Sequence, residues 1–329
     1  MRAVAISPAK LILFGEHFVV SGNSAISMSI DLPTVVTVEA SDEDLVHIKS
    51  EDLRLEASFS AIGQLVRASG ANAESTLRPI FEVSNFTLKK INASGRGLKI
   101  TVKSNVPIGM GLGSSAATAV GTISATTTLL SKPMTKDEIF EAAYSLERIV
   151  HGRPSGVDQA TVTYGGLISY RNGAVDSRLE VPKPPSLIIG NTGRRRSTGE
   201  YVSKVTRLRE TNPNKYNRIA SHAQKISENA AQALREGRHK DLGALMNENQ
   251  RLLELIGVSL PELEKLISAA ISAGALGAKL TGGGGGGCMI ALVDEETSVR
   301  VAQYIQEAGG QILSGKYAPH GVRASLQED

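Results

Sequence analysis

One glycine-rich stretch decides the fold of this chain: Pro107-Ile108-Gly109-Met110-Gly111-Leu112-Gly113-Ser114-Ser115-Ala116-Ala117. Its three glycines stand at alternating positions, so the backbone can bend sharply and its N–H groups can approach a ligand closely. The small and apolar residues of 114–130 predict a buried helix of about five turns directly after the loop. Because the positive end of that helix dipole would point at the loop, the stretch predicts an anion site, and a nucleotide phosphate is a natural occupant.

A glycine-rich turn in front of a core helix would look similar, so the loop alone leaves both interpretations open. The hydroxyls of Ser114 and Ser115 favour a ligand site, because a hydroxyl at a helix start can cap the helix or bind Mg²⁺. A P-loop is excluded, since it would continue as Gly-Lys-[Ser/Thr]. A dinucleotide site is excluded too, because residues 126–133, where its acidic residue would stand, contain no carboxylate.

Two carboxylates downstream of the loop are candidates for the same site. Thr135 and Glu138 form a Thr-x-x-Glu capping box that predicts a helix ending near residue 152, and Glu147 lies close to its end. Asp158 follows the rigid turn 154–156, which can direct a carboxylate into a cleft. Carboxylates repel phosphate oxygens unless a cation lies between them, so the pair predicts Mg²⁺. Taken singly, each acid is more often a solvated surface charge.

Ionisable residues also bracket a short apolar strand near the start of the chain. Lys10 leads into residues 11–14, and Glu16 and His17 follow that strand. A lysine that enters a buried strand needs a partner, and it can supply positive charge beside a phosphate. Solvated charges at a strand end are the plain alternative.

Six consecutive glycines, 282–287, come directly after Lys279-Leu280-Thr281. Strong apolar segments flank the run on both sides, which argues against low complexity. Such a run permits close backbone approach to a phosphate or to another chain segment. A flexible hinge is the alternative.

Composition excludes several classes of protein. The 329 residues carry a formal net charge of +3 with no concentrated basic face, so we expect no nucleic-acid partner. No apolar run approaches 18 residues, and the first residues lack the apolar core of a signal peptide, so we expect no membrane association and a cytoplasmic location. Cys288 is the single cysteine, which excludes an internal disulfide and suits a reducing compartment.

Strand and helix patterns occur in mixed order, which predicts an α+β fold of two domains with the active site in the cleft between them. The proline-rich segment 181–185 suggests a boundary, giving domains 1–182 and 183–329. Near the N-terminus, residues 2–20 suggest two strands around Ser7-Pro8, and residues 57–68 have roughly helical spacing. The remaining predicted elements are strands at 28–40, 97–104, 186–190 and 288–293, and helices at 216–235, 242–256, 261–273 and 298–308.

The motifs together resemble those of the GHMP kinase superfamily. Pro8-Ala9-Lys10 through Gly15-Glu16-His17, the 107–117 loop and the 282–287 run are similar in order and spacing to its three motifs, and the match covers essentially the whole chain. Within the superfamily, residues 14–22 (FGEHFVVSG) and 147–158 resemble the compact microbial and archaeal mevalonate kinases. Galactokinases normally continue the Gly-Glu-His motif with Thr-Asp, where this chain has Phe18-Val19.

The resemblance implies ATP and Mg²⁺ as cofactors, mevalonate as the small-molecule substrate, and a role for each motif. Asp158 would accept the proton of the substrate hydroxyl, and Lys10 would polarise that hydroxyl. Residues 107–117 would wrap the ATP phosphates, with Ser115 and Glu147 as Mg²⁺ ligands. The substrate-binding residues implied are Glu16, His17, Arg196 and Thr198, with Arg196 facing the mevalonate carboxylate.

Other functions stay open at this point. The chain is also compatible with a GHMP kinase for phosphomevalonate, homoserine or a sugar, with a related decarboxylase, or with a sensor that binds metabolites without turnover. The joint presence of Asp158, Lys10 and Glu147 disfavours the sensor. Arg194 and Arg195 would suit a second phosphate and therefore keep phosphomevalonate open, and a homodimer is compatible with the resemblance.

Overall fold

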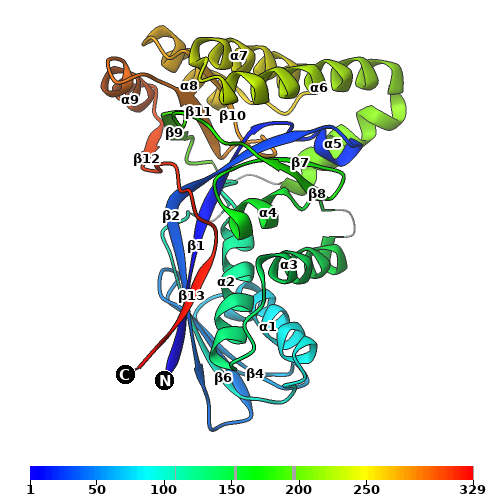
Figure 1. The fold of residues 1–329 in the computed structure, drawn as a ribbon, viewed down its shortest axis with the longest axis vertical. Coiled ribbons are helices and arrows are strands. Elements are labelled where there is room, and N and C mark those ends of the chain that lie inside the picture. Colours follow the sequence, from blue (N-terminus) through cyan, green and yellow to red (C-terminus); the bar gives the residue numbers. More distant parts are fainter. Residues whose placement is uncertain (108, 152–153, 195–197, 329) are drawn as a thin grey trace.

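The structure is a computed structural model and describes residues 1–107, 109–151, 154–194 and 198–328. Two β-sheets, each covered by helices, make up the molecule, with most strands of the larger sheet in the lower half of Figure 1 and the smaller sheet near the top. The mixture of separate helices and mainly antiparallel strands confirms the predicted α+β class.

The larger sheet has nine strands in the order β13-β1-β2-β6-β3-β4-β5, with β7 paired to β2 and β8 to β7. Its strands are β1 (Arg2–Phe14), β2 (Ala25–Ala40), β3 (Leu45–Ser50), β4 (Leu55–Ser60), β5 (Leu65–Ser69), β6 (Leu98–Ser104), β7 (Leu167–Arg171), β8 (Ala174–Arg178) and β13 (Arg323–Gln327). All pairs are antiparallel except β3 with β6.

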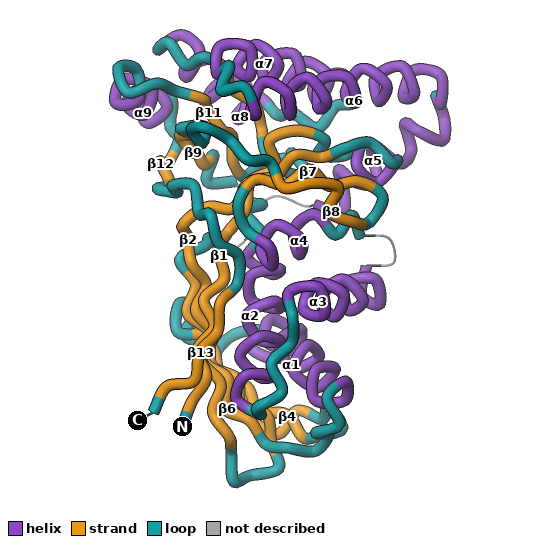
Figure 2. Tube along the Cα trace, in the orientation of Figure 1, coloured by secondary structure: helices purple, strands orange, loops and turns teal. Residues whose placement is uncertain are grey.

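Helices cover one face of this sheet (Figure 2). They are α1 (Ala73–Lys90), α2 (Ser114–Leu129), α3 (Lys136–His151) and α4 (Val157–Tyr164). The central helix α2 is rich in Ala, Thr and Val, and Ala117, Val120 and Ile123 are completely buried against the sheet. Small side chains let this helix lie close to β1 and β2, so its N-terminus reaches the middle of the molecule.

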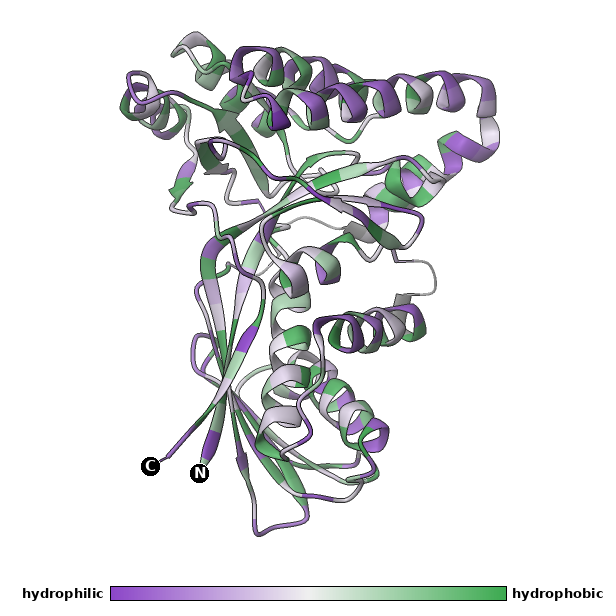
Figure 3. Cartoon of the chain, viewed as in Figure 1, coloured by the Kyte–Doolittle hydropathy of each residue, from purple (hydrophilic) through white to green (hydrophobic). Residues whose placement is uncertain are grey.

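The smaller sheet has the order β10-β11-β9-β12. Its strands are β9 (Leu187–Asn191), β10 (Gly277–Leu280), β11 (Cys288–Leu292) and β12 (Gln311–Leu313), and the helices of this half are α5 (Thr198–Thr211), α6 (Pro213–Arg235), α7 (His239–Leu255), α8 (Pro261–Ser272) and α9 (Ser298–Glu307). Figure 3 shows hydrophobic and hydrophilic residues alternating along α6, as expected for a helix with one buried face.

One apolar cluster extends across the two halves, while α1 and α2 pack against the larger sheet in a separate cluster. The second half of β1 lies in the same buried cluster as residues of α6, α7, α8 and β11. The chain also returns at its end, because β13 pairs with β1, and the two termini lie close together (Figure 1). Residues 323–327 therefore belong to the larger sheet, whereas the sequence had assigned all of 183–329 to a second domain.

The predicted capping box, which rests on residues close together in the sequence, was confirmed. In the capping box, Glu138 Oε2 accepts from the Thr135 N–H at 2.7 Å, and Thr135 Oγ1 accepts from the Glu138 N–H at 3.3 Å. The helix predicted at 57–68 was wrong, since β4 and β5 form an antiparallel hairpin there. The predicted turn at Ser7-Pro8 was also wrong, because β1 runs through Pro8 with only a register shift against β2.

Candidate active site

The glycine loop adopts a backbone that requires its glycines. Gly109, Gly111 and Gly113 have φ values of 77°, 85° and 82°, in the left-handed region that other residues rarely occupy. A Cβ on Gly113 would also lie only 2.7 Å from Cγ of Lys10. The Lys10 N–H donates to the Leu112 carbonyl at 2.9 Å, so the loop is tied directly to β1.

A cavity of about 740 Å³ opens beside this loop. Its walls come from the loop, the start of α2, one face of α1 and the end of β6, and both Glu147 and Asp158 reach it. Apolar side chains of α1 and β6, among them Ile80, Val83 and Val102, also line it. The cavity therefore combines carboxylates and a glycine-rich backbone with apolar side chains.

Lys10 and Asp158 form an ion pair at the charged end. Their Nζ and Oδ1 atoms lie 2.7 Å apart, the Lys10 side chain is buried, and Asp158 retains 33% exposure. Asp158 lies in the first turn of α4, where the helix dipole favours a negative charge. A partly exposed carboxylate held by a buried ammonium has the geometry of a base that can receive a proton from a bound hydroxyl.

The Gly156 turn holds Asp158 in place. Gly156 precedes α4 with φ of 82°, and a Cβ there would lie 2.2 Å from the Tyr170 hydroxyl and 2.8 Å from the Tyr144 ring. The Tyr170 hydroxyl is buried and has no hydrogen-bond partner among the described residues. Two tyrosines thus pack directly against the backbone that orients the carboxylate.

Glu147 has the electrostatic character of a cation ligand. Burial, and then the nearby charge of Asp158, raise its pKa to about 7, while Lys10 acts in the opposite direction. A divalent cation would offset the repulsion between the Glu147 and Asp158 carboxylates. No cluster of three or more His, Cys, Asp or Glu occurs in the part of the chain that the structure describes. The Glu147 carboxylate and the Ser115 hydroxyl both line the cavity, and such a set suits Mg²⁺, which keeps waters and takes further oxygens from phosphates.

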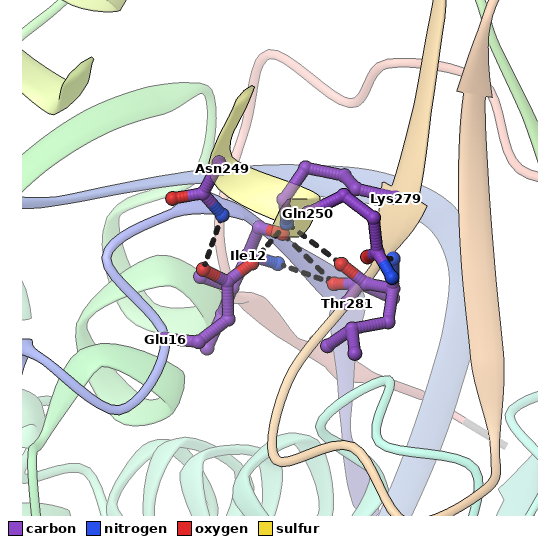
Figure 4. Close-up of polar contacts among 7 residues, drawn as sticks. Ile12, Glu16, Asn249, Gln250, Lys279 and Thr281 are labelled. Atoms are coloured by element: carbon purple, nitrogen blue, oxygen red, sulfur yellow. Dashed lines mark hydrogen bonds and ion pairs between the residues drawn. The ribbon is translucent and has the colours of Figure 1, made fainter. Parts of the chain in front are cut away.

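Glu16 and His17 contact the second half of the chain. Both Glu16 and Lys279 have fully buried side chains and form an ion pair, and Asn249 Nδ2 donates to the second Glu16 oxygen at 3.2 Å (Figure 4). His17 Nε2 lies 2.9 Å from the Gly283 carbonyl oxygen. The 15–17 turn thus joins β1 to the glycine run.

Comparisons with known proteins decide the family. The family model "GHMP kinases N terminal domain" matches residues 79–166, and "GHMP kinases C terminal" matches 230–311. The mevalonate kinase of Thermococcus gammatolerans is 38% identical over 333 residues, covering 98% of each chain, and that of Pyrococcus furiosus is 37% identical with the same coverage. The chain belongs to the mevalonate kinase family.

Solved structures agree with this assignment to the mevalonate kinase family. The mevalonate kinase of Methanococcus jannaschii superposes with a TM-score of 0.84 at 29% identity, covering 96% of this chain and 98% of that one. The L. major mevalonate kinase in complex with R-mevalonate superposes with a TM-score of 0.80 at 29% identity, covering 96% of both chains. The resemblance to GHMP kinases and the predicted fold are thereby confirmed.

The structure brings most of the predicted site residues of this mevalonate kinase family member together. Asp158, Glu147, Ser115 and the described part of 107–116 line one cavity, and Lys10 pairs with Asp158 there, whereas Ala117 is buried in the core. Ile108 and Arg196 lie outside the described residues, and the structure describes only the backbone of Thr198, at the start of α5.

Glu16 requires a correction. We expected it to face the substrate, but its side chain has no exposed surface and both oxygens are occupied by Lys279 and Asn249. A carboxylate that has lost its water needs such partners, and they come from β10 and α7, which sequence spacing does not relate to β1.

Sequence reasoning missed the tyrosines behind Gly156 and the apolar wall of the cavity. Helix α1 supplies part of that wall, and we had predicted no helix at 73–90. Its periodic apolar residues Leu77, Ile80, Phe81 and Leu88 were the signal that would have revealed it.

Proposed function

We propose that this protein transfers the γ-phosphoryl group of ATP to the C5 hydroxyl of (R)-mevalonate and releases ADP and (R)-5-phosphomevalonate, in the mevalonate pathway of isoprenoid biosynthesis. The observation that supports it best is the Lys10–Asp158 pair, 2.7 Å apart, beside a glycine loop at the start of a helix. The family relationship supports the choice of substrate.

In this proposal Asp158 receives the proton of the C5 hydroxyl as the new oxygen–phosphorus bond forms and the bond from the γ-phosphorus to the bridging oxygen of ADP breaks. Lys10 stays positively charged beside the forming alkoxide and beside Asp158. The loop 107–117 and the N-terminus of α2 bind the phosphate oxygens through backbone N–H groups. Positioning and electrostatics then supply most of the rate enhancement, as is usual for phosphoryl transfer.

Ser115 and Glu147 would hold Mg²⁺, which neutralises phosphate charge when bound. Glu147 has to be ionised for this role, and with its pKa raised to about 7 it is only partly ionised at neutral pH until a cation favours the charged form.

On the substrate side, we assign His17, Arg196 and Thr198 to mevalonate, with Arg196 binding its carboxylate. Glu16 is assigned instead to the buried contact with Lys279.

A cytoplasmic enzyme fits the single, buried Cys288. Among the described helices, none has the length and apolar character needed to cross a bilayer. We leave a homodimer as a prediction for sedimentation measurements.

The decisive experiment measures ADP release with mevalonate, phosphomevalonate, galactose and homoserine in parallel. We expect turnover with mevalonate to exceed that with the other three by orders of magnitude, and Asp158→Asn to abolish most of it. Preference for any other acceptor, or equal ADP release without an acceptor, would contradict the proposal.

A further inference from the structure

A buried polar contact joins the turn after β1 to β10 and α7 (Figure 4). Lys279, on β10, pairs with Glu16 and also donates to the Leu280 carbonyl at 2.6 Å. Asn249, on α7, donates to the other oxygen of Glu16 at 3.2 Å. The two charged residues are 263 positions apart in the sequence and both side chains are fully buried.

A buried ion pair adds little net stability. Desolvation of the two charges cancels much of their attraction, and well-packed apolar residues would often serve the fold equally well. Burial lowers the pKa of Lys279, and the Glu16 carboxylate opposes that shift. What the pair adds over an apolar contact is one defined position of β10 relative to the 15–17 turn.

The segment that this position controls is the glycine run. Within 282–287, five glycines have φ between 68° and 115°, so the run has wide conformational freedom and depends on its neighbours for a fixed shape. Thr281 Oγ1 donates to the Ile12 carbonyl at 2.9 Å and accepts from the Ile12 N–H at 3.0 Å. With His17 bound to the Gly283 carbonyl, three contacts connect this segment to β1 and its turn.

The strand that Thr281 contacts, β1, also carries Lys10. Ile12 lies two residues beyond Lys10, whose N–H binds the Leu112 carbonyl of the phosphate loop. One edge of β1 therefore contacts the phosphate loop at Lys10 and the start of the glycine run at Ile12. A displacement of β10 along β1 would move the glycine run relative to Lys10.

We infer that Lys279 is a positioning residue for the phosphoryl transfer: through Glu16 it holds the 282–287 backbone in register with the β1 strand that carries Lys10. The inference rests on the proposed function only in placing the reacting groups beside Lys10. For Glu16 to contact the substrate directly, its carboxylate would have to leave both Lys279 and Asn249. The buried ammonium of Lys279 would then have no counter-charge.

The test compares Lys279→Met with the double variant Lys279→Met/Glu16→Gln. The single variant leaves Glu16 without its counter-charge, and we expect a strongly lowered Tm. The double variant removes both charges and keeps an acceptor for Asn249, so its Tm should return to within a few degrees of wild type. Its kcat should nevertheless stay about 10- to 100-fold below wild type, because the glycine run is no longer held in register.

Hydrogen exchange provides a readout that needs no turnover. Peptides covering 282–287 should exchange faster in the double variant, while those of β12 stay unchanged. The surface pair Lys49–Glu56, 3.1 Å apart on β3 and β4, is the control, and Lys49→Met/Glu56→Gln should change neither kcat nor exchange at 282–287.

A double variant with restored Tm, wild-type kcat and native exchange at 282–287 would overturn the positioning role and leave Lys279 merely structural. If Glu16→Gln prevents folding, Lys279→Met/Glu16→Leu replaces it as an apolar pair, with the same expected results. Absence of mevalonate turnover in the wild type would refute the proposed function instead, and the exchange comparison would still decide the inference.

Discussion

Substitution of Gly156 by alanine tests how Asp158 is positioned. The added methyl group would lie 2.2 Å from the Tyr170 hydroxyl and 2.8 Å from the Tyr144 ring, at a residue with φ of 82°. The left-handed conformation costs an alanine about 1–2 kcal/mol. Overlap in a packed site adds about 1–3 kcal/mol. The sum, about 2–5 kcal/mol, corresponds to a fall in Tm of about 3–7 °C for a chain of this size.

Activity should fall more than stability alone explains. Gly156 immediately precedes the helix that carries Asp158, so a shift of this turn moves the carboxylate away from the 2.7 Å contact with Lys10. We expect a loss of about 10- to 100-fold in kcat, measured by ADP release at temperatures where the variant is folded. The KM for ATP should change little, because the glycine loop lies on a different segment.

Two further variants separate strain from overlap. Gly309 has φ of 94° with no atom within 4 Å of an added Cβ, so Gly309→Ala should cost only the backbone strain and leave kcat unchanged. Tyr170→Phe removes the oxygen that the new methyl group meets, so it should restore part of both kcat and Tm in the Gly156→Ala background. Alone it should be neutral or slightly stabilising, since it removes a buried hydroxyl that has no partner among the described residues. If Gly156→Ala behaves like Gly309→Ala, or Tyr170→Phe restores nothing, the steric reasoning is refuted.

Three other expectations concern the chemistry. Asp158→Asn should lower kcat about 10²- to 10⁴-fold while ATP still binds in calorimetry, and near-normal turnover would remove it as the base. Because the pKa of Glu147 is raised to about 7, protons compete with Mg²⁺ for its carboxylate below that pH, and the Mg²⁺ concentration for half-maximal rate should rise as the pH falls from 8 to 6. Glu147→Gln should raise that Mg²⁺ concentration at all pH values and flatten its pH dependence. A change confined to the mevalonate KM would exclude the metal role. Arg196→Ala should raise the mevalonate KM roughly 10-fold or more, on the scale of about 1.5–3 kcal/mol for a charged hydrogen bond. Arg194→Ala should change the KM little, since Arg194 pairs with Glu262 at the surface at 2.7 Å. The reverse result would contradict the assignment of Arg196 to the substrate carboxylate.

Much of the site could be predicted because its signals are local. Closely spaced glycines before a run of small residues demand a left-handed loop and a helix start, whatever surrounds them, and the Thr135–Glu138 box satisfies its helix terminus within four residues. The candidate residues for binding phosphate, binding the cation and accepting the proton therefore stood out in the sequence.

Short apolar segments could not be assigned in the same way. Leu55, Ala57 and Phe59 are buried at every second position of β4, but residues 57–68 contain two strands and a turn, and their apolar spacing over so short a window also suits a helix. Pairing of β4 with its neighbours decides between the two, and that pairing depends on residues far away in the sequence.

The amino-acid sequence by itself determined the family, the phosphate loop and the candidates Lys10, Glu147 and Asp158, since these depend on backbone freedom and residue chemistry over a few positions. Only the tertiary structure decided what Glu16 contacts, which half of the molecule the last strand joins, and which tyrosines stand behind Gly156. Glu16 and Lys279 look like ordinary charges in the sequence. They become a buried pair because β10 packs beside the end of β1, where each charge is stripped of water and finds its partner in the other.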